Sequence, residues 1–266
     1  MFTAPRFPLV CLATLLLSVV LPGALNRVCL AESGWPVEYQ QGNIRIYSQV
    51  SAEKIAPPVK ELADFQRYLA MALQLTLNDH PVDLVVFSSM HEYRSYIRPR
   101  HPEAISRPAL FVKSNGTLTV YVVYGNDFVR NLKHEFTHAT LHGSLPYLPI
   151  WVDEGLAEFF EVPQDQLGYQ AHYHDNLNWR LRFRHKVRTT ELENLQGLEE
   201  MRPEHYRDCW AWIYFCLHES PESRNLLREY LGQIQEEEVV GSLLARIEQA
   251  LPNSQDRIEQ FYRNLK

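Results

Sequence analysis

Residues 134–138 read HEFTH and residues 151–158 read WVDEGLAE, and the prediction of the fold starts from these two short stretches. His134 and His138 lie four residues apart, just over one helical turn, so in a helix both imidazoles project from the same face. Two imidazoles placed in this way can bind a single zinc ion. Glu135 follows the first of them and lies beside the metal. It can take a proton from zinc-bound water, whose pKa the ion lowers to about 7.

A third ligand follows in the second stretch. Glu154 comes after a connection that contains Pro146 and Pro149, at the start of an amphipathic segment that can fold back against the first helix. Glu158 lies one turn later on the same face, where we expect it to accept a hydrogen bond from His134 and fix its tautomer. Two histidines, one carboxylate and an open position for water are typical of a catalytic rather than a structural zinc site.

The two stretches together resemble the gluzincin zinc metallopeptidases, and in particular the secreted peptidase-MA-like group. The resemblance covers roughly residues 82–231 and includes the LPIW sequence at 148–151. It implies an α+β zincin fold with a small β-rich N-terminal lobe, an active-site helix and a helical C-terminal lobe. It also implies that Glu154 is the third ligand and that the strand at 118–124 is a sheet edge, beside which an extended peptide or protein substrate binds.

The family also uses a tyrosine at the start of a later helix to stabilise the oxyanion, and Tyr206 matches that position. The alternative is that Tyr206 only packs on the lobe, and His205 is the adjacent competitor for the role. His142 lies about 12 Å along the helix from His134, too far for one metal to join both with His138. We expect His142 to support a ligand or to be solvated. The pair His172 and His174 is interpreted as a surface pair rather than part of the site.

The local patterns predict the surrounding elements. Residues 82–87 form an apolar run of strand length, and 109–124 predict a hairpin because Asn115-Gly116 supplies its turn. A helix is expected from Asp127 to about His142, ended by Gly143 in a left-handed conformation. Beyond the zinc site the 3.6-residue period predicts an almost entirely helical chain.

The N-terminus predicts export. An apolar run from Leu9 to Leu21 is too short to span a bilayer comfortably, and it favours a signal peptide over residues 1–31, cleaved after Ala31 or, alternatively, after Ala24. A retained anchor is the other reading. The mature chain, 32–266, is then a single domain without a stable membrane span, with a β-rich lobe at 32–132 and the zinc-site helices and helical lobe at 133–266. The expected location is secreted or periplasmic, in the cell envelope.

The charge balance argues against a nucleic-acid partner. The formal charge is −6, and the predicted mature chain keeps 24 basic and 32 acidic residues, which gives −8. The basic run at 180–188 is interpreted as a solvated face, with recognition of an acidic group or an envelope polymer as the alternative. Cys209 and Cys216 lie about 10 Å apart if helical, too far for a disulfide, and are expected to be buried.

These observations predict an exported hydrolase that binds one Zn²⁺ and cleaves peptide bonds, with Glu135 as general base. A catalytically silent zinc-binding module of the cell envelope and a hydrolase of cell-wall amide bonds remain as alternatives. The sequence does not indicate an oligomeric state.

Overall fold

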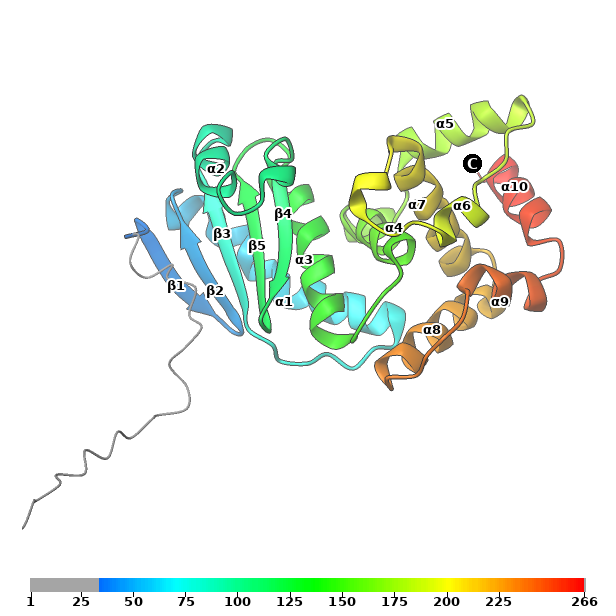
Figure 1. Cartoon of the computed structure of the whole chain (residues 1–266), viewed down its shortest axis with the longest axis horizontal. Coiled ribbons are helices and arrows are strands. Elements are labelled where there is room, and N and C mark those ends of the chain that lie inside the picture. Colours follow the sequence, from blue (N-terminus) through cyan, green and yellow to red (C-terminus); the bar gives the residue numbers. More distant parts are fainter. Residues whose placement is uncertain (1–33, 266) are drawn as a thin grey trace, which may run out of the picture.

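The computed structural model describes residues 34–265, so the predicted signal peptide lies outside the described part. The chain is an α+β protein, with a small sheet in its N-terminal part and a mostly helical remainder (Figure 1). The coarse class predicted from the sequence is therefore confirmed. The predicted division between residues 132 and 133 stays a prediction, since the helix that spans this point packs against the sheet and against the next helix.

Within the described residues the strands form one five-stranded sheet in the order β1-β2-β3-β5-β4. The sheet is mixed: β2, β3 and β5 are parallel, and β1 and β4 pair antiparallel at the two ends. The strands are β1 (Val37–Gln41), β2 (Ile44–Ser48), β3 (Val82–Phe87), β4 (Ala109–Ser114) and β5 (Thr117–Val123).

The prediction that residues 118–124 form a sheet edge is wrong. This strand, β5, pairs with β3 on one side and with β4 on the other, so β4 is the edge strand. The hairpin turn predicts that β4 and β5 pair, but it does not predict which of them lies inside the sheet. The inner strand is β5, because it also pairs with β3, which is distant in sequence. Leu118 to Val123 are all buried, while β4 is half-exposed, as expected for an inner and an outer strand.

Helices cover both faces of the sheet. Helices α1 (Ala52–Leu73) and α3 (Phe128–Ser144) pack on the face that carries Val120 and Val122. The opposite face, which carries Val85 and Tyr121, is covered by α2 (Met90–Ile97) and the 3₁₀ turn η1 (Pro102–Ala104). Alternate residues of a strand point to opposite faces, which explains why neighbours on β5 join different cores.

Two local predictions have different outcomes. The Asn115-Gly116 turn is confirmed, with φ of 50° and 78° at the two residues, as a two-residue hairpin loop requires. The expected left-handed end, at Gly143, of the helix that carries His134 and His138 is wrong. Helix α3 continues to Ser144, and extended Leu145 ends it while its N–H still donates to the Leu141 carbonyl. The helix is therefore about two residues longer than expected.

The C-terminal part is built around α7, which is buried along most of its length. Helix α4 packs so closely on it that a Cβ on Gly155 would lie 2.7 Å from the carbonyl oxygen of Cys209. Cys209 and Cys216 are buried and free, as predicted. None of the helices within residues 34–265 is long and apolar enough to cross a membrane. The elements are α4 (Ile150–Phe160), η2 (Gln164–Gln166), α5 (Ala171–Arg182), α6 (Thr190–Glu193), η3 (Leu198–Glu200), α7 (Pro203–His218), α8 (Pro221–Gln235), α9 (Leu243–Ala250) and α10 (Ser254–Asn264).

Candidate metal centre

Helices α3 and α4 bring the three predicted ligands together. The Nε2 atoms of His134 and His138 lie 3.6 Å and 3.8 Å from Oε2 of Glu154. These distances are too long for hydrogen bonds, and Oε2 is buried without a hydrogen-bond partner. The three ligand atoms all lie within 4.8 Å of one another. The three side chains predicted from the two sequence stretches therefore do meet at one point.

The geometry fits a bound divalent cation. Tetrahedral zinc with bonds of about 2.0–2.2 Å separates its ligand atoms by roughly 3.4 Å, close to the distances found here. Burial lowers the pKa of both imidazoles, but the surrounding carboxylates outweigh it: the pKa of His134 is raised well above its ordinary value and that of His138 to about 9. The carboxylates of the pocket thus favour positive charge on the two imidazoles. A bound metal ion would supply that positive charge in place of the protons on the imidazoles.

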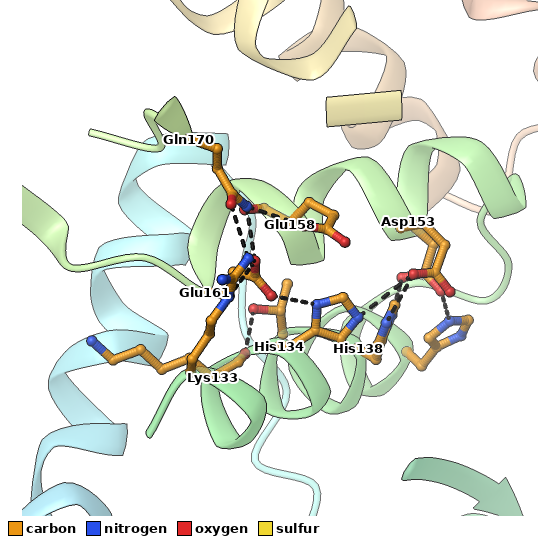
Figure 2. A network of polar contacts seen from close by, with 11 residues as sticks. Lys133, His134, His138, Asp153, Glu158, Glu161 and Gln170 are labelled. Atoms are coloured by element: carbon orange, nitrogen blue, oxygen red, sulfur yellow. Dashed lines mark hydrogen bonds and ion pairs between the residues drawn. The ribbon is translucent and has the colours of Figure 1, made fainter. Parts of the chain in front are cut away.

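The prediction for Glu158 is wrong, because Glu161 takes its place. Nδ1 of His134 lies 3.0 Å from Oε2 of Glu161, and Figure 2 shows the two side chains facing each other. A proton on Nδ1 leaves Nε2 free to face Glu154. Seven residues make almost two full helical turns, so Glu161 lies nearly in line with Glu154 on α4 and reaches the N-terminal turns of antiparallel α3.

Glu161 is itself buried and is held in place by a network that includes the half-exposed Arg130. Arg130 donates from Nε over 2.8 Å and also from Nη2 to its Oε1, and the Gln170 amide donates to the same oxygen over 2.8 Å. Glu158 accepts a hydrogen bond from the Gln170 amide over 3.1 Å. Its carboxylate lies near His134 and Glu161, with the ligand atoms of the three side chains within 4.8 Å of one another, but it forms no hydrogen bond with His134 in the described part of the chain. Burial and the charge of Glu161 raise the pKa of Glu158 to about 8, which favours its neutral form at pH 7.

The far side of His138 is different. Its Nδ1 lies 2.9 Å from Oδ1 of Asp153, and Oδ2 of the same carboxylate lies 2.8 Å from Nε2 of His142. Asp153 lies on the opposite side of the imidazole pair from Glu161 (Figure 2). The ring of Phe111, from edge strand β4, stacks on both His138 and His142. His142 is therefore linked to His138 through Asp153, which is compatible with one of the two roles expected for it.

Glu135 and Tyr206 both lie in the electric field of this centre. Burial raises the pKa of Glu135, and the charges of the two histidines partly offset the rise. Burial, together with the negative charge of Glu154, raises the pKa of Tyr206 to about 12. A smaller contribution to both groups comes from Arg107, whose positive charge lowers their pKa.

Two further histidines singled out from the sequence, His205 and His174, have structural roles. His205, the competitor of Tyr206, is 3% exposed; its Nδ1 accepts the N–H of Arg202 and its Nε2 lies 2.8 Å from Glu191, so it caps α7. His174 is buried between the Tyr169 hydroxyl and the Asn178 amide. The expectation of a surface pair is therefore wrong for His174, whereas His172 is exposed.

Sequence reasoning missed five residues of this centre. Asp153 and Glu161 are acidic and flank the predicted ligand on α4, so the helical period gave some signal for them. Arg130 and Gln170 contact the site only through the fold. Arg107 lies in the loop before β4, where no spacing rule points to the metal.

The chain has no significant match among models of protein families or among curated proteins. The assignment of a function consequently rests on the centre itself.

Proposed function

We propose that this protein is a zinc-dependent hydrolase with a zincin fold, and specifically a metallopeptidase of the gluzincin type. One observation carries the proposal: the buried Oε2 of Glu154 has no hydrogen-bond partner and faces two imidazole nitrogens at 3.6 Å and 3.8 Å. A buried carboxylate oxygen without a hydrogen bond is costly unless positive charge, on protonated imidazoles or on a bound cation, lies beside it. Glu135, directly after the first of these histidines, has no place in a purely structural site.

His134, His138 and Glu154 would hold the ion. When bound, zinc supplies a Lewis acid that polarises a carbonyl group and makes water acidic. Glu135 accepts the proton of the attacking water and passes it to the amine that leaves. Its raised pKa suits this exchange, since a stronger base accepts a proton more readily near neutral pH.

Tyr206 stabilises the charge that develops on the substrate. The pKa of its phenol, about 12, keeps the hydroxyl protonated at neutral pH, so it can donate a hydrogen bond to the carbonyl oxygen as that oxygen becomes negative. The charge of Glu154 contributes to this pKa, which is consistent with a phenol close to the ligands.

The substrate would bind along β4 rather than β5. Edge strand β4 lies beside the centre, because its Phe111 stacks on His138. An unpaired strand edge can hydrogen-bond an extended peptide, which places successive peptide bonds past the ligands. The proposal also keeps export as its setting, on the strength of the leader-like sequence alone.

The decisive experiment compares the wild-type protein with Glu135→Gln on a mixed peptide library. Both proteins should bind one zinc ion per chain by metal analysis, and the substitution should lower turnover by about 10²–10⁴-fold. His138→Ala should lose both zinc and turnover. Equal product profiles for the wild type and Glu135→Gln at equal zinc content would refute the peptidase. Products from a cell-wall digest, with none from peptides, would support amide hydrolysis in the cell wall instead.

A further inference from the structure

A second feature lies at the far end of α5, at the corner of the helical part away from the sheet (Figure 1). Trp179 and Phe183 are one helical turn apart, and their ring centroids lie 4.9 Å from each other. Their exposed fractions are 57% and 62%. Two large aromatic side chains in water at one place are unfavourable for a protein surface unless something covers them.

The same end of the helix carries an excess of positive charge. Arg182, Arg184 and Lys186 are exposed, and none of them forms an ion pair with a carboxylate in the part of the chain that the structure describes. Arg263 of α10 reaches the same place, where it donates to the carbonyl of Leu181 over 3.2 Å. This cluster stands in a chain whose formal charge is −6. The whole-chain balance therefore does not explain it.

We propose that this surface, the α5 tip (Trp179, Arg182, Phe183, Arg184 and Lys186), docks the protein on an anionic phospholipid bilayer. Indole and phenyl rings partition into the headgroup boundary of a bilayer, and arginine and lysine bind its phosphates. A bilayer surface covers both aromatic rings and compensates the unpaired cations at the same time. A soluble polyanion would satisfy the cations and leave the rings in water.

Vesicle binding tests the proposal with two independent variants. One removes the aromatic rings (Trp179→Ser with Phe183→Ser), and the other reverses two of the charges (Arg182→Glu with Lys186→Glu). The matched controls are Met71→Ser with Val239→Ser, which are exposed apolar residues elsewhere, and Lys60→Glu with Arg98→Glu. All proteins keep the same N-terminus, so any binding by the leader is common to them.

The wild type should sediment with phosphatidylcholine vesicles that contain phosphatidylglycerol, more weakly at high salt, and much less with phosphatidylcholine alone. Each α5-tip variant should lower the partition coefficient about tenfold or more, with the controls within about twofold of wild type. Brominated lipid should quench the fluorescence of the wild type more than that of Trp179→Phe.

Thermal unfolding curves that match the wild type would show that the variants are folded. Tip variants that bind anionic vesicles as well as the controls do would overturn the proposal. So would binding to an anionic polysaccharide without binding to anionic vesicles. None of these readouts requires a metal ion, so the outcome is independent of the proposed hydrolase.

Discussion

The Nε2 atoms of His134 and His138 both face Glu154, but the Nδ1 atoms of the two rings face different carboxylates. His134 is held by Glu161, which Arg130 and Gln170 fix in turn from α3 and from the residue before α5. His138 is held by Asp153, an aspartate shared with His142 at the start of α4. The side chain of Glu161 is 6% exposed and that of Asp153 is 15% exposed.

The difference shows that one helix supports both ligands by unequal means. Glu161, directly after the C-terminal end of α4, is a carboxylate that is almost fully buried, whereas Asp153, near the N-terminal end, is a carboxylate closer to solvent. Electrostatic interactions strengthen as water is excluded, so the first support should matter more for metal affinity. Both depend on the position of α4, which is set by its contact with α7.

The largest expected effect comes from breaking both supports together. In Gly155→Ala the added Cβ would lie 2.6 Å from Cγ1 of Ile213 and 2.7 Å from the Cys209 carbonyl oxygen, and backbone atoms of α7 cannot easily move aside. We expect the free energy of unfolding to fall by about 3 kcal/mol and zinc binding to weaken. Urea unfolding measures the first and metal analysis the second.

Gly232→Ala is the matched control, because an added Cβ there meets nothing within 4 Å and alanine favours α8. It should leave stability unchanged or raise it by up to about 1 kcal/mol. A Gly155→Ala protein as stable as this control would mean that α4 and α7 are not as close as described.

The second prediction removes the stronger support alone. Glu161→Gln takes the negative charge away from His134 and leaves Arg130 without its partner, so zinc affinity should fall by about 10–100-fold. Competition with a chelator measures the change. Glu158→Gln is the control, since a neutral acid loses no charge when it becomes an amide, and it should alter affinity by less than about threefold. A larger effect at Glu158 than at Glu161 would restore the assignment made from the sequence.

Comparison of the sequence predictions with the structure shows which features of the site and fold can be predicted and which cannot. The candidate ligands His134, His138 and Glu154 could be named because helical spacing is local and fixes which side chains share a face. The helical spacing allows either Glu158 or Glu161 to face His134. Which of the two does so depends on how far α4 is shifted along α3, and this shift is set by the packing of the helices. The inner place of β5 and the position of Arg107 depend on contacts with distant segments. Local sequence patterns do not encode such contacts, so these features could not be predicted.

The third prediction tests the weaker support. Asp153→Asn keeps an oxygen that can accept from Nδ1 of His138 but removes the charge, in a position that solvent reaches more easily than Glu161. Zinc affinity should fall by about tenfold, less than in Glu161→Gln. The same chelator competition ranks the two variants. Equal losses would contradict the argument that burial makes the supports unequal.

The smallest effect is expected at His142, which touches no ligand atom and acts through Asp153. His142→Gln should lower zinc affinity by about two- to threefold, because Asp153 keeps its ion-pair contact with His138 and loses only its hydrogen bond with His142. The double variant with Asp153→Asn separates this role from a direct one. If His142 works only by positioning Asp153, the double variant should bind zinc as Asp153→Asn does, and the two changes should not add. Fully additive losses would instead mean that His142 interacts with the ion or with His138 on its own account.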